Sequence, residues 1–305
     1  MKDITTLNLA YPAQSDIKFD HSKFPDGQQS IKITSDISKV VAIKIYSRFT
    51  TFRDLELILC ATAALKNLGM KDIFLYLPYF LGGRSDRQFE TGSINYIKDI
   101  IAPIINAQDY SGVLVLDPHS DVIEACINRF IKIENTLFVK SALDKIKDEL
   151  PRTQFDPTSN RNICFISPDA GALKKIYPLA SECGITNIIT ASKVRDLTTS
   201  QILYTDVPLV NINSDPTVFV IVDDICDGGR TFIEVAKAIR KNRPTPIYQD
   251  KIFLVVSHGI FSNGLYELSK WVDGVWSTNS FSDIKADDFS DYTVSSNFLT
   301  QLNVF

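Results

Sequence analysis

Basic excess, cysteine frameworks and membrane-spanning runs are all missing from this 305-residue sequence. Its 32 Lys and Arg face 36 Asp and Glu, for a net charge of −4, whereas nucleic-acid and membrane-surface partners usually require a basic patch. No apolar run approaches the roughly 20 residues that cross a bilayer. The N-terminal segment from Met1 to Thr6 has no apolar signal core. We therefore predict a cytoplasmic protein with neither nucleic-acid nor membrane partners.

Cysteine is sparse: the five residues are odd in number and no two have CxxC spacing. Disulfide frameworks and structural zinc sites are therefore disfavoured, and a reducing compartment is favoured. What the sequence does contain is ordinary for a globular protein, with 45% hydrophobic and 22% charged residues. At about 100–200 residues per domain, the length predicts two domains.

Strand-like apolar runs alternate with helix-like segments along the first half of the chain. The strand-like runs are Val40–Ile45, Ile73–Leu77, Val113–Leu116 and Leu137–Val139. Helices are predicted at Asp54–Leu68, where apolar residues recur at three- and four-residue steps, and near Val122–Phe130. This alternation is typical of a parallel sheet with helices on both faces.

The same pattern restarts after Lys145–Arg161, a charged stretch that contains two prolines. The later strands are predicted at Ile163–Ile166, Asn187–Thr190, Val218–Val222 and Ile252–Val256, and the later helices at Ala170–Cys183 and Arg230–Arg240. We predict an α/β fold of two tandem domains, each a mostly parallel sheet flanked by helices. The expected limits are 1–145, 146–290 and a C-terminal tail, 291–305, that packs back on the N-terminal domain.

The strongest motif is Val218 to Phe232, an apolar strand followed by acids, glycines, a threonine and a helix. Its acidic pair, Asp223 and Asp224, would lie at the carboxyl end of a parallel strand, where open α/β sheets bind ligands. Such a pair suits a sugar diol or a hydrated magnesium ion. The glycines and the helix start favour phosphate. The competing interpretation is an acidic turn whose polar groups only cap the helix.

This block resembles the loop that binds phosphoribosyl pyrophosphate (PRPP) in type I phosphoribosyltransferases and ribose-phosphate pyrophosphokinases. The resemblance implies two phosphoribosyltransferase-like domains. It also implies a set of residues that bind ribose 5-phosphate or PRPP, namely Asp223, Asp224, Asp227, Gly228, Gly229 and Thr231. Arg230 stands where the family usually has glycine just before the threonine, so the register of the loop could differ.

Two segments of the first half resemble ribose-phosphate pyrophosphokinases rather than transferases. Lys23 to Gln28 is similar to the family's Phe-x-Asp-Gly-Glu segment, with glutamine in place of the glutamate, and otherwise indicates a plain turn. Pro78 to Arg87 is similar to the family's Pro-Tyr-x-x-x-x-Arg-Gln-Asp-Arg segment, and otherwise indicates a solvated charged loop. The ATP-binding residues that these matches imply are Phe24, Asp26, Gln28, Arg84 and Ser85.

Three further segments follow predicted strands. Asp117-Pro118-His119-Ser120 resembles the family's Asp-Leu-His-Ala, which implies that His119 contacts ATP and magnesium. Ser167 to Gly171 resembles Ser-Pro-Asp-x-Gly, so Asp169 would also bind magnesium, although an aspartate there equally predicts a helix cap. Lys193 and Arg195 match the Lys-x-Arg of the family's mobile catalytic loop, where two cations can stabilise a transferring phosphoryl group.

Six such segments follow one another in family order from residue 24 to residue 231. The resemblance implies Mg²⁺-dependent transfer of the β,γ-diphosphoryl group of ATP to the 1-hydroxyl of ribose 5-phosphate, by a homo-oligomer. Two alternatives stay open. A type I phosphoribosyltransferase would need the acidic loop alone, and a non-catalytic regulatory subunit would share the fold. The presence of His119, Asp169 and Lys193 disfavours the regulatory subunit.

Overall fold

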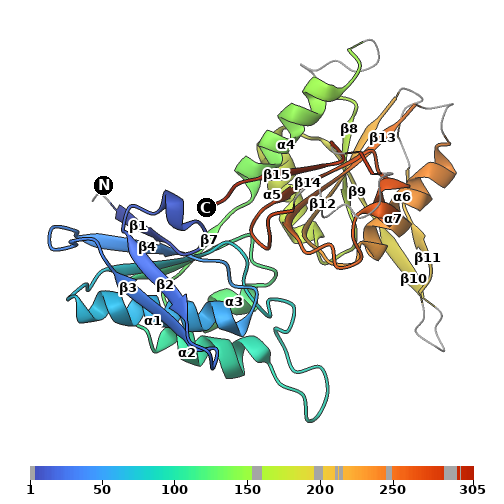
Figure 1. The fold of residues 1–305 in the computed structure, drawn as a ribbon. Coiled ribbons are helices and arrows are strands. Elements are labelled where there is room, and N and C mark those ends of the chain that lie inside the picture. Colours follow the sequence, from blue (N-terminus) through green and yellow to red (C-terminus); the bar gives the residue numbers. More distant parts are fainter. Residues whose placement is uncertain are drawn as a thin grey trace. The chain divides into compact units, whose positions relative to one another are not determined.

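A computed structural model describes residues 4–152, 160–195, 202–209, 212, 216–244, 249–284, 294–295 and 297–305. The chain forms two compact units (Figure 1): unit 1 comprises Met1–Glu134 with Val304–Phe305, and unit 2 comprises Asn135–Asn303. Each unit contains a parallel β-sheet with helices packed on it, which confirms the predicted α/β fold class. The domain limits proposed at residues 145 and 290 stay predictions.

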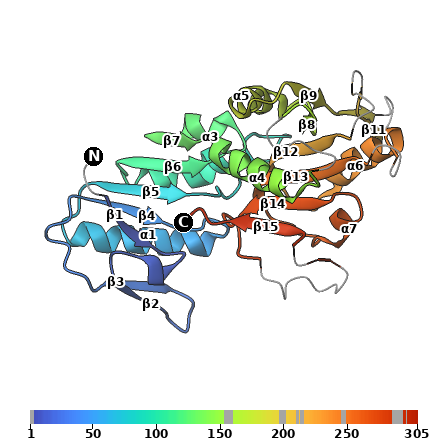
Figure 2. The ribbon, with the colours of Figure 1, turned by 90° about the horizontal axis from the view of Figure 1, so that it is seen from above.

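Unit 1 is built on a five-stranded sheet of order β1-β4-β5-β6-β7, in which every neighbouring pair is parallel. The strands are β1 (Ile4–Asn8), β4 (Ala42–Tyr46), β5 (Ile73–Leu77), β6 (Gly112–Leu116) and β7 (Phe130–Ile133). The helical segments are η1 (Pro12–Gln14), α1 (Phe52–Asn67), the π-helical η2 (Ile97–Ile101), α2 (Ala102–Asn106) and α3 (Asp121–Cys126). An antiparallel hairpin, β2 (Phe19–Lys23) and β3 (Gln29–Ile33), lies beside α1 (Figure 2).

Helix α1 begins where the sequence supplies a reciprocal cap. Thr51 accepts a hydrogen bond from the backbone N–H of Asp54, and the carboxylate of Asp54 accepts one from the N–H of Thr51. The small polar residue in its apolar stripe, Thr62, is fully buried. Its hydroxyl donates to the carbonyl of Ile58 and lies 2.7 Å from the hydroxyl of Tyr110. Thr62 therefore fills a core position without leaving a buried hydroxyl unpaired.

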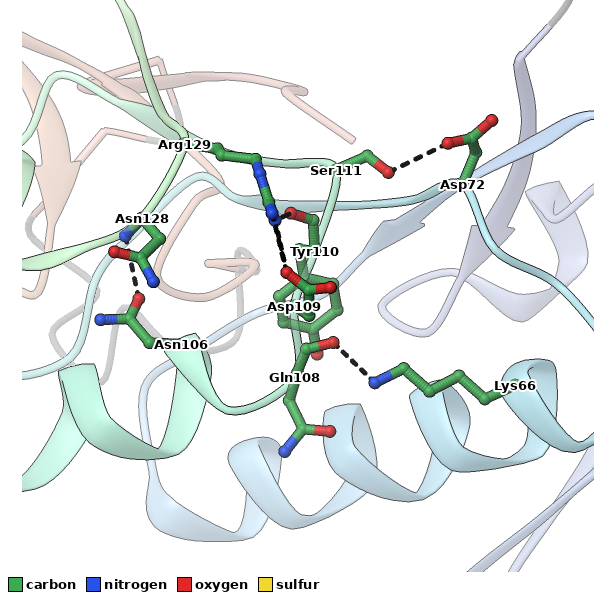
Figure 3. A network of polar contacts seen from close by, with 9 residues as sticks. All are labelled: Lys66, Asp72, Asn106, Gln108, Asp109, Tyr110, Ser111, Asn128 and Arg129. Carbon is green, nitrogen blue, oxygen red and sulfur yellow. Dashed lines mark hydrogen bonds and ion pairs between the residues drawn. The ribbon is translucent and has the colours of Figure 1, made fainter.

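Polar contacts tie together the loops that precede β5, β6 and β7 (Figure 3). The guanidinium of Arg129 donates to Asp109 Oδ1 through both terminal nitrogens at 2.8 Å, and to the carbonyl of Tyr110. Lys66 reaches from α1 to the carbonyl of Gln108 at 2.6 Å. This network joins the loops at the amino ends of the strands. The loops that carry Arg84 and His119 follow β5 and β6, at the opposite, carboxyl edge of the sheet.

One predicted strand, Leu137–Val139, is wrong. These residues lie in the first turn of helix α4 (Thr136–Glu149). The strand of that region is β7, which begins at Phe130, seven residues before Leu137. The helix buries Phe138, Val139, Ala142, Leu143 and Ile146 at helical spacing, whereas Leu137 is 81% exposed. A short apolar run fits either element, and here the longer helical period decides.

Unit 2 is built on a six-stranded sheet of order β15-β14-β13-β12-β8-β9, again parallel throughout. The strands are β8 (Ile163–Ser167), β9 (Asn187–Thr190), β12 (Val218–Cys226), β13 (Lys251–Gly259), β14 (Gly274–Thr278) and β15 (Leu299–Leu302). The other helices are α5 (Leu173–Cys183), α6 (Arg230–Asn242) and α7 (Tyr266–Ser269). Strands β10 (Ser192–Arg195) and β11 (Ile202–Asp206) form a separate antiparallel ribbon.

The core of unit 2 has two layers, one on each face of the sheet. Phe219 and Ile221 of β12 pack in the cluster that contains the buried face of α6. Val218 and Val220 pack in the cluster that contains α4 and α5. This alternation along one strand is the period-two pattern of a sheet covered on both faces. Within the described residues no helix is both long and apolar enough to cross a membrane, and all five cysteines are free thiols.

Candidate active site

The acidic loop of unit 2 connects β12 to α6 at the carboxyl edge of the sheet. Strand β12 runs to Cys226 rather than to the predicted Val222, so Asp223 and Asp224 lie within the strand. They extend past its pairing with β8, which ends at Ile221, and remain beside β13. Gly229 caps α6 with φ 78°, a left-handed conformation that favours glycine. Arg230 and Thr231 are the first two residues of α6, and their N–H groups have no acceptor within the helix. The loop therefore presents donors and the positive end of a helix dipole to an anion.

The acidic pair is crowded and partly desolvated. Burial raises the pKa of Asp223 well above its usual range, and the carboxylates of Asp224 and Asp169 raise this pKa further. The backbone N–H of Asp224 donates to Asp223 Oδ1 at 2.9 Å and offsets part of that effect. Asp224 itself is only 6% exposed. A cation or a hydroxyl donor beside the pair would relieve this repulsion.

The sequence analysis did not predict one residue of this site, Lys175 of α5. Its Nζ lies 2.9 Å from Asp224 Oδ2, and the two side chains are 34% and 7% exposed. The two residues are 49 positions apart. A lysine on a helix face has no local signal for such a contact, because only the packing of α5 beside β12 brings them together.

Asp169 lies in the turn between β8 and α5. Its Oδ1 accepts hydrogen bonds from the N–H groups of Gly171 at 2.9 Å and Ala172 at 3.1 Å. The turn delays α5, which begins at Leu173 rather than at the predicted Ala170. The helix-cap interpretation of Asp169 is therefore wrong, because Ala172 is the N-cap of α5 and Asp169 instead closes the turn that precedes it. The same carboxylate is close enough to influence the pKa of Asp223, so it also belongs to the acidic cluster.

A second loop, residues 260–264, braces the acidic loop from the end of β13. The hydroxyl of Ser262 donates to Asp227 Oδ1 at 2.6 Å, and the amide of Asn263 donates to the carbonyl of Gly228 at 3.3 Å. The N–H groups of Ile260 and Phe261 both donate to the carbonyl of Cys226. These contacts fix the course of the loop on which Asp227 and Gly228 lie.

In unit 1 the structure brings the arginine loop and the histidine loop together after β5 and β6. A Cβ added at Gly83 would lie 3.5 Å from the Cβ of His119. The neighbouring Asp86 is 4% exposed and contacts Arg87 at 3.0 Å. Burial acts to raise the pKa of Asp86, but hydrogen bonds from Arg87 and Ser120 outweigh it and the pKa is lowered. Asp86 thus joins the two loops.

Arg84, Ser85 and His119 are themselves exposed at this edge. Their side chains are therefore accessible to a ligand, whereas Asp86 and the buried Asp117 support the loops from beneath. Asp117 has φ 39°, and its N–H donates to the carbonyl of Ile133 at 2.8 Å. The ATP-binding roles of the three exposed residues stay predictions.

Phe24, Asp26 and Gln28 lie at the tip of the β2–β3 hairpin. The N–H of Phe24 donates to the carbonyl of Gln28, the N–H of Gln28 donates to Asp26 Oδ1, and Gly27 has φ 101°. The turn predicted at this segment is therefore present. Phe24 is 51% exposed, which is unusual for a phenylalanine and leaves its ring available for stacking.

The backbone of Lys193 and Arg195 lies in β10 and pairs with β11. The sequence had suggested a loop for these residues, whereas they belong to an antiparallel ribbon whose register shifts between Val194 and Arg195. Residues 196–201, which separate β10 from β11 along the chain, lie outside the described residues.

The carboxylates of unit 2 fit a magnesium ion that is bound through few protein ligands. Magnesium prefers oxygen ligands and keeps several waters, and usually reaches the protein through one or two carboxylates and substrate phosphates. Asp169 and Asp223 supply such oxygens, and their mutual repulsion would fall on binding a divalent cation. Among the described residues, no three His, Cys, Asp or Glu side chains lie close enough to enclose an ion. An all-protein cage is therefore disfavoured there.

Comparison with known proteins gives one consistent set of relatives. No protein-family model matches the chain. A ribose-phosphate pyrophosphokinase of Sulfurisphaera tokodaii is 27% identical over 271 residues, which cover 87% of this chain and 84% of the relative. One from Mycoplasmopsis pulmonis is 27% identical over 260 residues, covering 84% and 74%. The crystal structure of phosphoribosylpyrophosphate synthetase from Mycobacterium smegmatis superposes with a TM-score of 0.76 at 16% identity, over 99% of this chain and 95% of that one.

Proposed function

We propose that this chain, a divergent member of the ribose-phosphate pyrophosphokinase family, transfers the β,γ-diphosphoryl group of ATP to the 1-hydroxyl of ribose 5-phosphate. The 1-oxygen attacks the β-phosphorus, the bond from that phosphorus to the α,β-bridging oxygen breaks, and the hydroxyl proton passes to solvent. PRPP and AMP are the products. The observation that carries the proposal is the acidic pair within the last four residues of β12, followed by the glycine-capped start of α6.

The acidic loop would hold ribose 5-phosphate. Asp223 and Asp224 would accept hydrogen bonds from the ribose hydroxyls, because carboxylates suit a diol. The N–H groups of Gly228 to Thr231, with the hydroxyl of Thr231, would surround the 5-phosphate at the helix start. Asp227 would begin the loop that surrounds the phosphate. The hydrogen bond that Ser262 donates to Asp227 supports this arrangement, because it fixes the loop before any ligand arrives.

The remaining residues would act on ATP. Arg84, Ser85 and His119 of unit 1 are exposed at the strand ends and would contact its phosphates and base, together with Phe24, Asp26 and Gln28 of a hairpin tip. Lys193 and Arg195 would stabilise the charge that develops on the transferring group. The resemblance implies that Asp169 and His119 would each contact magnesium, and Asp223 would offer a further oxygen beside Asp169. When bound, magnesium would neutralise the charge of the ATP phosphates.

A homo-oligomer, in the cytoplasm, completes the proposal. The family resemblance implies that the hairpin segment would contribute to the adenine pocket of a neighbouring subunit. The exposed ring of Phe24 supports such a role, because an apolar ring at a hairpin tip gains burial only from something outside its own unit.

The test is AMP formation by the purified protein with ribose 5-phosphate, ATP and magnesium, each omitted in turn. We expect AMP and PRPP in equal amounts, and only with all three present. AMP absent across several nucleotides and metals, with added phosphate, would favour the regulatory subunit or the phosphoribosyltransferase, and PRPP binding would then separate these two.

The catalytic cations are tested by Lys193→Ala. We expect kcat to fall by at least about a hundredfold while the KM values change by less than threefold, because the side chain is proposed to act on developing charge rather than on bound substrate. A large rise in KM at constant kcat would assign Lys193 to substrate binding instead.

A further inference from the structure

The acidic pair of unit 2 has an ion-pair partner that the proposed reaction does not use. Lys175 reaches Asp224 from α5, with 2.9 Å between Nζ and Oδ2. Asp224 is almost fully buried, whereas Lys175 is about one-third exposed. The contact is therefore a bond between a buried acid and a cation that enters from the rim of the site.

The bond limits what Asp224 can do. A carboxylate has two oxygens, and the ammonium of Lys175 occupies one side of Oδ2, which fixes the plane of the group. The N–H of Asp224 is committed to Asp223 Oδ1, so backbone and side chain at this position are held by different partners. A hydroxyl donor then meets a carboxylate of defined orientation, at little entropic cost.

We propose that Lys175 is a positioning residue of the sugar subsite, which orients Asp224 and compensates its charge so that the pair can accept the ribose diol. This inference rests on the proposed function. Its position supports the role: Lys175 lies in the first turn of α5, directly after the turn that Asp169 closes, so one short segment supplies both an acid and a cation to the cluster.

The test compares three variants of the full-length protein. Lys175→Met removes the charge but keeps the length of the side chain, Lys175→Arg keeps the charge, and Lys174→Met removes the charge of the exposed neighbour on the same helix. We expect KM for ribose 5-phosphate to rise by about tenfold to a hundredfold in Lys175→Met, which is the contribution of charge-assisted hydrogen bonds. KM for ATP should change less than twofold, Lys175→Arg should recover most of the loss, and Lys174→Met should resemble the wild type.

A double-mutant cycle separates positioning from general stability. If Lys175 acts through Asp224, Lys175→Met should add less than twofold to the KM of an Asp224→Asn variant. Equal rises in both backgrounds, or equal rises in KM for ATP and ribose 5-phosphate, would overturn the proposal. Should Lys175→Met not fold, the same cycle with Lys175→Gln decides. A wild type that makes no AMP refutes the proposed function instead, and PRPP binding by calorimetry would then test Lys175 separately.

Discussion

A methyl group at Gly229 should damage both the stability of unit 2 and its binding of ribose 5-phosphate. Gly229 caps α6 in the left-handed region with φ 78°. A Cβ at this position would lie 3.1–3.3 Å from three side-chain atoms of Leu268, which is 2% exposed. Gly229→Ala therefore combines backbone strain with overpacking against a buried leucine.

The two contributions can be separated by a second glycine. A left-handed alanine costs about 1–2 kcal/mol, and overpacking a well-packed site typically costs about 1–3 kcal/mol more. Gly264 has φ 68°, and nothing lies within 4 Å of a Cβ added there. Gly264→Ala should therefore show the backbone cost alone. We expect Gly229→Ala to lower the free energy of unfolding by about 1–3 kcal/mol more than Gly264→Ala.

Tryptophan fluorescence reports this unfolding selectively. The chain has two tryptophans, Trp271 and Trp276, and both belong to unit 2. Thermal or denaturant unfolding followed by tryptophan fluorescence therefore reports on unit 2 and not on unit 1, which has its own core. For a unit of this size, each 1 kcal/mol corresponds to a shift of about 2–4 °C in Tm. KM for ribose 5-phosphate should rise in Gly229→Ala and stay within twofold in Gly264→Ala.

Equal loss of stability in the two alanine variants would refute the packing argument, since it would mean that Leu268 moves aside without cost. An unchanged KM for ribose 5-phosphate in Gly229→Ala would refute the second part. The start of α6 would then not contact the substrate phosphate as proposed. The match between this loop and the family's would have to be shifted in register at Arg230.

Two further outcomes concern the same edge of the sheet. Ser262→Ala removes the bond to Asp227 and should raise KM for ribose 5-phosphate several-fold with little change in Tm, since Ser262 is exposed; a lower Tm with constant KM would make the bond purely structural. Asp223→Asn should raise the Tm of the ligand-free protein near neutral pH, because the folded state raises the pKa of Asp223 above its unfolded value of about 3.9 and so disfavours the ionised wild type. This gain should shrink as the pH falls through the folded pKa, where the wild-type carboxyl binds a proton; a gain independent of pH would contradict it.

The regular elements followed from local patterns in the sequence. β5 and β9 have the predicted bounds, and α6 begins at the predicted Arg230, because continuous apolar runs and a glycine before a helix are signals within a few neighbouring residues. Leu137–Val139 failed because three apolar residues fit either period. Strands at the edges of the sheets, such as β15, have too short an apolar run to be recognised from sequence alone.

The candidate site divides in the same way. The acidic loop could be predicted because its residues are adjacent, and Arg84 and His119 because each lies in a short segment, after a predicted strand, that resembles the family. Lys175 and Ser262 could not, since their partners lie 49 and 35 positions away and depend on which strands become neighbours. Local sequence therefore predicts candidate residues for the chemistry, but not the side chains that contact them from other parts of the chain.

The all-parallel order of the unit 2 sheet has a consequence for biosynthesis. Strand β15 pairs with β14 in parallel, although residues 279–298 separate them along the chain. Until residues 299–302 leave the ribosome, the outer edge of β14 has no strand beside it, and unpaired edges are templates for association with other chains. Nascent unit 2 should therefore be the part of the chain most dependent on chaperones, whereas the five strands of the unit 1 sheet have all been synthesised by residue 133.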